Sequence, residues 1–111
     1  MASVHEDGTQ SATLDTEHTL NTTTPETTDG VFQFVVDLAN MVNGDIVVLK
    51  VKEKCLSGGT QRLVWRKQFA HVQGEPLAIS PSLILLHGWD FTLEQTDGAA
   101  GRSFPWSIRK A

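Results

Sequence analysis

The sequence predicts an all-β protein, an antiparallel β-sandwich of jelly-roll type with an extended N-terminal arm. Three observations predict this fold. Short runs rich in valine, isoleucine and phenylalanine, or alternating between apolar and polar residues, recur along the chain after Gly30. Clusters of glycine, proline, asparagine and aspartate separate these runs, as turns separate short strands. No segment carries a convincing amphipathic helix pattern.

Residues 1–29 differ in composition from the rest of the chain. They contain six acidic side chains, nine threonines and no lysine or arginine, whereas all nine Lys and Arg residues lie between Lys50 and Lys110. Their few apolar side chains cannot offset a backbone ordering entropy of about 1 to 2 kcal/mol per residue. We therefore divide the chain into an acidic, Thr-rich extended arm (1–29) and a β-sandwich body (30–111). We expect the arm to lie on its own body or on a partner.

The body opens with a run for which two structures compete. Phe32, Phe34 and Val36 share one side of a strand over residues 30–38. A helix over residues 31–43 would instead align Phe34, Val35, Leu38, Met41 and Val42, with Gly44 as its stop signal. We favour the strand, because β-branched and aromatic residues dominate and Asn43-Gly44-Asp45 is typical of a turn.

Two longer strands follow, over residues 45–56 and 60–72, with a three-residue loop at 57–59 between them. This register gives the hairpin one apolar and one cationic face. Cys55 lies on the apolar face, so we expect its small side chain to be buried. The register sets Lys54 opposite Arg62 and Lys50 opposite Arg66, a repulsion of up to about 1 kcal/mol that a neighbouring anion would relieve. One interpretation is a docking face for an acidic surface, either a partner subunit or the acidic arm of the same or a neighbouring copy. The alternative is a solvated face that protects an edge strand against aggregation. The apolar face comprises Val47, Leu49, Val51, Cys55, Leu63, Trp65 and Phe69, and the cationic face Lys50, Lys52, Lys54, Arg62 and Arg66.

The remaining third of the chain predicts short strands and one flexible loop. Residues 77–80 fit a short strand, and residues 82–86 are apolar without alternation, as in a strand covered on both sides. Trp89, Phe91 and Leu93 alternate with polar residues in a further strand. A flexible connection over residues 97–103 precedes a terminal strand at 104–108.

The sequence shows no arrangement typical of an enzyme or cofactor site. The four histidines are far apart and lack a neighbouring Cys-x-x-Cys pair, so we predict no metal ligands. No Gly-x-Ser-x-Gly elbow occurs, and the loop at 98–103 lacks the ending of a phosphate cradle. We therefore predict no catalytic residues and no cofactor.

Charge and hydropathy exclude two classes of partner. A net charge of -4 and a pI near 5.4 argue against general nucleic-acid binding. No run approaches the roughly 20 apolar residues that span a membrane. The single cysteine allows no intrachain disulfide. A protein partner is the remaining expectation.

The candidate partner-binding residues are the cationic face and one tryptophan. Trp65 and Trp89 are in phase with apolar neighbours, so we expect both to be buried. Trp106, beside Pro105 near the C-terminus, is the more plausible interface residue. The predicted set is Lys50, Lys52, Lys54, Arg62, Arg66 and Trp106.

Several segments together resemble small virion proteins of tailed bacteriophages. They are the acidic Thr-rich lead, the stretch GVFQFVVDLANMVNGDIVVLKVKEK, the turn AHVQGEP and the closing GRSFPWSI. The chain is most similar in character to capsid staple, or decoration, proteins of the epsilon-fifteen type of short-tailed phage. The resemblance implies a jelly-roll-like sandwich that binds the major capsid protein on the outer surface of the virion. It also implies a homodimer, synthesis in the host cytoplasm and no catalytic residues.

Two other functions stay open. A carbohydrate- or receptor-binding β-sandwich accessory of a virion would use Trp106 or Trp89 as a stacking platform. A small assembly chaperone would act on the particle and be absent from its finished form.

Overall fold

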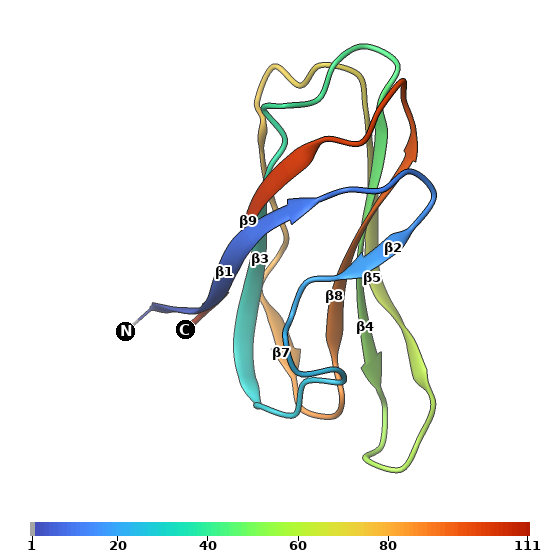
Figure 1. The fold of residues 1–111 in the computed structure, drawn as a ribbon. Helices are drawn as coiled ribbons and strands as arrows, with labels where there is room; N and C mark the ends of the chain where they lie inside the picture. The colour runs from blue at the N-terminus through green and yellow to red at the C-terminus, as the bar shows by residue number, and fades with distance from the viewer. Residues whose placement is uncertain (1) are drawn as a thin grey trace.

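A computed structural model describes residues 2–111, which form nine strands in two antiparallel sheets packed face to face (Figure 1). The chain is therefore an all-β sandwich, as predicted. The described residues contain no helix that could cross a lipid bilayer. The strands are β1 (Ser3–Ser11), β2 (Glu17–Thr19), β3 (Gly30–Asp37), β4 (Ile46–Lys54), β5 (Gln61–Ala70), β6 (Leu77–Ile79), β7 (Leu83–Leu85), β8 (Asp90–Asp97) and β9 (Ser103–Lys110).

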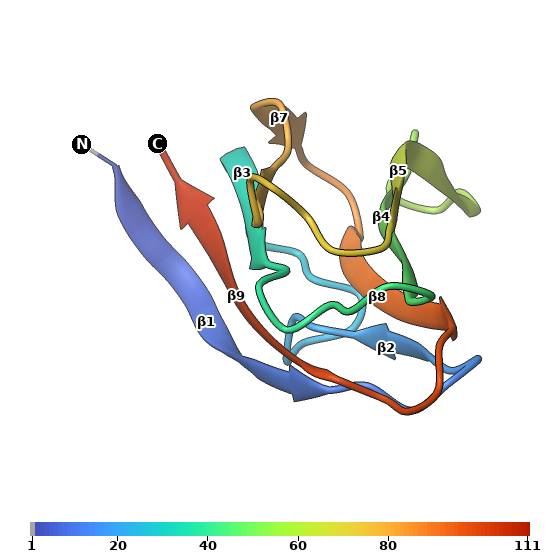
Figure 2. The same ribbon diagram turned by 90° about the horizontal axis from the view of Figure 1, so that it is seen from above.

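The chain passes repeatedly from one sheet to the other. Sheet A has the order β1-β9-β3-β6, with β7 also paired to β3, and sheet B has the order β2-β8-β4-β5. Seen from above, the two sheets face each other, and β2 lies at the same side of the sandwich as β1 (Figure 2). Among the described strands, β5 ends sheet B and pairs only with β4.

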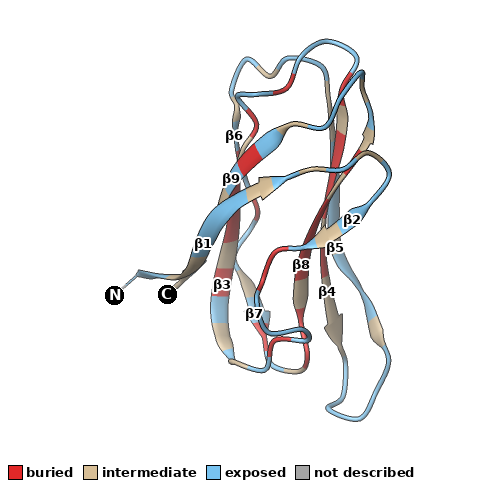
Figure 3. Cartoon of the chain, viewed as in Figure 1, coloured by how far each residue is buried: buried red, intermediate tan, exposed pale blue. Residues whose placement is uncertain are grey.

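The core lies between the sheets because the strands alternate apolar inward residues with polar outward ones. Phe32, Phe34 and Val36 are at most 1% exposed, which confirms the predicted inward side of β3. Buried segments of β3, β4 and β8 face one another in Figure 3. The largest fully buried side chains are Trp89, Phe32, Phe34, Phe91, Phe104, Leu38, Leu49, Leu85, Leu93, Ile108, Gln95 and Val36.

Residues 31–43 form a strand and a turn, so the preferred interpretation is confirmed. β3 ends at Asp37, and Leu38 N–H donates to the carbonyl of Pro76 at 2.8 Å. Gly44 has a φ of 100°, which side chains other than glycine rarely adopt, and it forms the turn into β4. Leu38 and Met41 still reach the core from the turn, although no helix brings them there.

The β4–β5 hairpin departs from the predicted register. The connection spans residues 55–60 instead of 57–59, and the register shifts between Val51 and Lys52. Lys50 lies opposite Arg66 as predicted, but Glu53 and not Lys54 lies opposite Arg62. A bulge moves every side chain beyond it to a new position, and pattern alone does not locate the extra residue.

The bulge also explains two wrong burial predictions in this hairpin. Cys55 is exposed because it lies in the connection and not in the strand. Leu63 is 53% exposed because it follows the altered register near the hairpin tip. Trp65 and Phe69, on the other side of the bulge, pack against the core and are half-buried.

The short strands in the second half of the chain occur where they were predicted, with one error. β7 is not covered on both sides, because Leu85 is fully buried whereas Ile84 is 73% exposed. β7 pairs with β3 at its edge, and only one of its faces meets the core. Trp89, Phe91 and Leu93 are fully buried, as the alternation predicted.

The β8–β9 connection is held by buried polar groups, contrary to the expected flexible loop. Gln95 is fully buried, donates to the carbonyl of Ala100 at 2.9 Å and accepts the N–H of Arg102 at 2.9 Å. Arg102 Nε donates to Asp45 Oδ2, also at 2.9 Å. A Cβ at Gly98 would collide with both Asp45 and Gln95, so this loop closes tightly over the end of the sandwich.

The described part of the acidic segment, residues 2–29, lies on the body of its own chain, one of the two alternatives that the sequence left open. β1 pairs with β9 in sheet A, and β2 pairs with β8 in sheet B. Leu20 and Asn21 are buried, and Asn21 Oδ1 accepts the N–H of Phe91 at 2.8 Å. The segment thus obtains from the body the hydrogen bonds and apolar contacts that it lacks alone.

The buried Asp45 carboxylate makes stability dependent on Arg102 and on pH. Burial opposes ionisation of Asp45, but the Arg102 hydrogen bond, the Val42 N–H and the Arg102 charge outweigh it and lower the pKa of Asp45. Arg102→Ala should reduce the free energy of unfolding at pH 7 by about 2 to 4 kcal/mol, because a buried charge loses its partner. Urea unfolding measures this, with exposed Arg109→Ala as the control, expected within about 0.5 kcal/mol of wild type.

The pH dependence of the same variant provides a second readout. The stabilisation from Asp45 is present above its unfolded pKa, about 3.9, and is lost as the pH falls through the lower folded pKa. Arg102→Ala should weaken that acid-induced loss, because the folded pKa rises when the guanidinium is removed. Equal stability of the Arg102 and Arg109 variants at every pH would contradict this role of the ion pair.

Candidate functional site

The predicted partner-binding residues lie on both sheets. The five cations belong to the β4–β5 hairpin of sheet B, whereas Trp106 belongs to β9 of sheet A. The two groups therefore do not form one surface, and each has its own surroundings.

Two of the predicted cations are already paired with the N-terminal segment. Glu17 of β2 lies 3.1 Å from Lys52 Nζ and 3.7 Å from Lys50 Nζ. Thr92 Oγ1 donates to the same carboxylate at 2.8 Å. Partial burial opposes ionisation of Glu17, but the hydrogen bonds from Thr92 and Lys52 and the two lysine charges outweigh it and lower its pKa. The anion that the opposed cations of the hairpin require is thus supplied within the chain.

The cations that stay accessible lie on β5. Arg62, Arg66 and Lys67 are exposed, and β5 carries no acidic residue. Leu63 and Val64, between two of these cations, are 53% and 45% exposed. Arg66 and Lys67 point to opposite faces of the strand, so β5 presents positive charge and apolar area on both faces of the free edge of sheet B. We call Arg62, Leu63, Val64, Arg66 and Lys67 the β5 surface.

A groove runs beside the β5 surface. It has a volume of about 510 Å³ and lies between β5 and β6, with Lys67 and Phe69 on one wall and Leu77 and Ile79 on the other. Lys67 Nζ lies 5.5 Å from the centre of the Phe69 ring, a cation–π contact at the rim of the sandwich. Leu77 and Ile79 are about half exposed. Gln73 and Glu75 also line the groove, so it combines apolar side chains with one cation and one acid.

Lys54 contributes less to this surface than predicted. The side chain of Lys54 is half-buried, and its aliphatic stem packs against Gly88. A Cβ added at Gly88 would lie 3.1 Å from Lys54 Cε. The backbone N–H of Lys54 donates to the carbonyl of His87 at 3.0 Å. Lys54 thus holds the hairpin against the β7–β8 connection.

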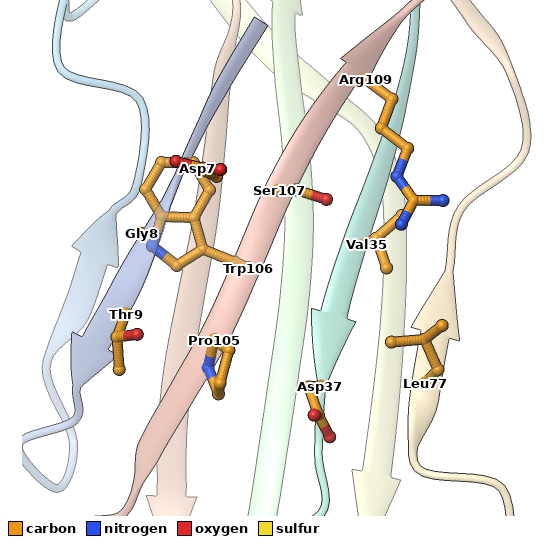
Figure 4. Close-up of a pocket in the computed structure, with 10 residues that line it drawn as sticks. All are labelled: Asp7, Gly8, Thr9, Val35, Asp37, Leu77, Pro105, Trp106, Ser107 and Arg109. Atoms are coloured by element: carbon orange, nitrogen blue, oxygen red, sulfur yellow. The ribbon is translucent and has the colours of Figure 1, made fainter. Parts of the chain in front are cut away.

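Trp106 is turned toward the core. It pairs with the fully buried Val36 and shares the inward side of β9 with Phe104 and Ile108. Its half-buried indole packs against the core and reaches Gly8 of β1, where an added Cβ would lie 3.2 Å from the ring (Figure 4). Trp89 is fully buried. Neither tryptophan offers an open ring face of the kind on which a sugar stacks.

A shallow groove of about 430 Å³ crosses the outer side of sheet A (Figure 4). The two carboxylates of Asp7 and Asp37 and the guanidinium of Arg109 supply its charged groups. Pro105 and Leu77 supply apolar area. These groups are able to hydrogen-bond a polar ligand. Trp106 is also among the residues that line the groove, but its ring lies against Gly8 and the core.

The structure brings together one group of side chains that the sequence did not connect. His5 Nε2 of β1 lies 3.5 Å from Glu26 Oε2, and Glu6 lies beside both. The residues are 21 positions apart in sequence, and no standard metal-ligand spacing links them. Glu17 was missed for the same reason, because its lysine partners lie 33 and 35 positions away. The only available signal was the concentration of acidic residues before Gly30.

No family model, curated protein or solved structure matches this chain.

Glu17→Gln tests whether the N-terminal segment neutralises the hairpin. The two ion pairs are partly exposed, so we expect the free energy of unfolding to fall by about 0.5 to 1 kcal/mol at low salt. The loss should shrink near 1 M salt, where the Debye length is about 3 Å. Urea unfolding at both salt concentrations measures it, and Asp29→Gln, an exposed acid of the same segment, is the control. A Glu17 variant that responds to salt as the control does would contradict the pairing.

Proposed function

We propose that the protein is a structural component of a phage virion that decorates the outer capsid surface and staples neighbouring capsid subunits. The β5 surface is the observation that carries this proposal, because it combines exposed cations, exposed apolar residues and a strand edge without a neighbour among the described strands. Such an edge favours contact with another protein chain.

The fold is compatible with that role. The chain alternates between two sheets whose main orders are β1-β9-β3-β6 and β2-β8-β4-β5. This alternation supports the jelly-roll assignment of the proposal, since jelly rolls consist of two packed antiparallel sheets with crossing connections. The long β strands also provide a rigid base for a surface that must hold adjacent subunits at fixed positions.

The chemistry of the β5 surface favours an acidic partner. β5 has three exposed cations and no acid, so pairing two β5 strands from two copies would set like charges against each other. We therefore assign the β5 surface to acidic groups of the major capsid protein and place the proposed homodimer contact elsewhere. Ile84 and Leu86, which are 73% and 51% exposed, supply apolar area for that second contact.

Arg66→Glu tests the β5 surface with little expected cost to folding, because the new carboxylate would lie opposite Lys50. We expect its affinity for undecorated phage capsid shells to fall at least about tenfold, equivalent to about 1.4 kcal/mol. Co-sedimentation with shells across a salt series measures this, with wild-type binding weakening as salt rises. Arg109→Glu makes the same charge change at an exposed residue of sheet A, and it should leave the affinity for shells nearly unchanged.

Two outcomes would overturn the capsid proposal. The first is failure of the wild-type protein to bind shells at any salt concentration. The second is equal binding by the Arg66 and Arg109 variants, which would remove the β5 surface from the contact.

Carbohydrate or receptor binding is the second candidate, and the groove of Figure 4 is the observation that favours it. Asp7, Asp37 and Arg109 would hydrogen-bond sugar hydroxyls there. The inward position of Trp106 weakens this candidate, because sugar binding on β-sandwiches commonly uses an exposed aromatic ring. Saturable binding on a glycan array that is lost in Asp37→Ala, together with no binding to shells, would favour it over the capsid proposal.

A further inference from the structure

We propose that His5, Glu6 and Glu26 form a binding site for a divalent transition-metal ion, with Zn²⁺ as the best fit. The site lies where β1 approaches the start of β8, on the opposite part of the fold from the β5 surface. It does not depend on the proposed capsid function.

The geometry brings three suitable ligand atoms together. One imidazole nitrogen and two carboxylate oxygens lie within 4.8 Å of one another. A tetrahedral ion with bonds of about 2.0 to 2.1 Å separates its ligands by about 3.4 Å. The pair formed by His5 Nε2 and Glu26 Oε2, at 3.5 Å, already has that spacing. Glu6, one oxygen of which lies within 4.8 Å of the other two ligand atoms, would complete a three-ligand set, with water in the remaining position.

A second, independent observation concerns charge. Glu26 is only 5% exposed, and none of the four ion pairs among the described residues joins it to a lysine or arginine. Lys110 Nζ lies over the Phe32 ring, 5.8 Å from its centre. A buried charge is normally paired or bound to a metal ion. Here a second carboxylate, Glu6, lies beside the first, so a divalent cation would neutralise both.

The Glu26 carboxylate is oriented by its neighbours. Thr27 N–H, Thr28 N–H and Thr28 Oγ1 all donate to Oε1, at 3.1, 3.1 and 2.9 Å. Because three donors occupy Oε1, Oε2 is left to face His5. Such outer hydrogen bonds orient ligands in known metal sites.

The other two ligands are also positioned by the fold. Thr22 donates its N–H and its hydroxyl to the two oxygens of Glu6, each at 3.0 Å. The His5 ring packs edge-on against Phe32, with ring centres 5.3 Å apart, and lies 5.9 Å from Trp89. The register of β1 shifts between Val4 and Glu6, and this bulge directs His5 toward Glu26.

The ligand types select the metal. Imidazole together with carboxylate suits Zn²⁺ and its neighbours in the first transition row, whereas oxygen-only sets suit Mg²⁺ and Ca²⁺. The bound ion would connect β1 of sheet A to residue 26, which forms an isolated bridge to Trp89 beside β8. Metal binding would therefore stabilise the attachment of the N-terminal segment.

Isothermal titration calorimetry with ZnCl₂ on the full-length, chelator-treated protein tests the site. A Cys55→Ser background removes the exposed thiol, which could bind zinc on its own. We expect one zinc ion per chain, a higher melting temperature with zinc, and much weaker binding of Mg²⁺ and Ca²⁺. The visible spectrum of the Co²⁺ form should be that of a low-coordinate site.

Matched variants assign the ligands. Glu26→Gln keeps an oxygen that accepts the threonine donors and removes only the charge, so its fold should persist. His5→Gln and Glu26→Gln should each weaken zinc binding at least about tenfold. His87→Gln removes a histidine that follows β7 and does not belong to the cluster, and it should leave zinc binding unchanged.

Two results would overturn the proposed zinc site. No saturable zinc binding by the full-length protein would overturn it, and so would equal affinity in the His5, Glu26 and His87 variants. Circular dichroism verifies that each variant is folded, and Glu6→Gln replaces Glu26→Gln if the latter unfolds. Neither result depends on whether the protein binds capsid shells.

Discussion

The burial of Trp89 is the constraint on which most of the structure depends. Its ring packs against Phe32 and Phe34 of the opposite sheet, with ring centres 4.6 and 5.7 Å apart. Its indole N–H donates to the carbonyl of Thr28 at 2.8 Å, and its backbone exchanges two hydrogen bonds with Glu26. One residue thus joins the two sheets and anchors the N-terminal segment. An aromatic side chain with a polar handle is suited to this double role.

The acidic segment and the basic hairpin form complementary parts of one domain. The segment lacks the apolar residues to fold alone, but β9 and β8 supply its backbone partners, and the core accepts Leu20. Its position also removes charge repulsion, because Glu17 lies between Lys50 and Lys52. One acid of the segment, Glu17, is therefore paired with two lysines of the hairpin. Three cations of β5, Arg62, Arg66 and Lys67, stay exposed.

The two sides of the sandwich consequently differ in what they offer a partner. At the β5 side, the edge is exposed, cationic and partly apolar, with a groove beside it. At the β1 side, carboxylates and an imidazole gather behind the strand, and the half-buried Trp106 closes the interior. A protein surface fits the first arrangement, and a small cation fits the second. The same chain separates these chemistries by placing them on different sheets.

The sequence by itself determined the β class, the inward faces of β3 and β8, the turn at Gly44 and the positions of most strands. These features follow from local periodicity and turn residues, which act over a few positions. Only the tertiary structure decided the bulge at Val51, the exposure of Cys55, the closed loop beside Asp45 and the inward Trp106. The pairs of Glu17 with Lys52 and of His5 with Glu26 were equally beyond reach. Each depends on which distant strands become neighbours, and local pattern carries no information about that pairing.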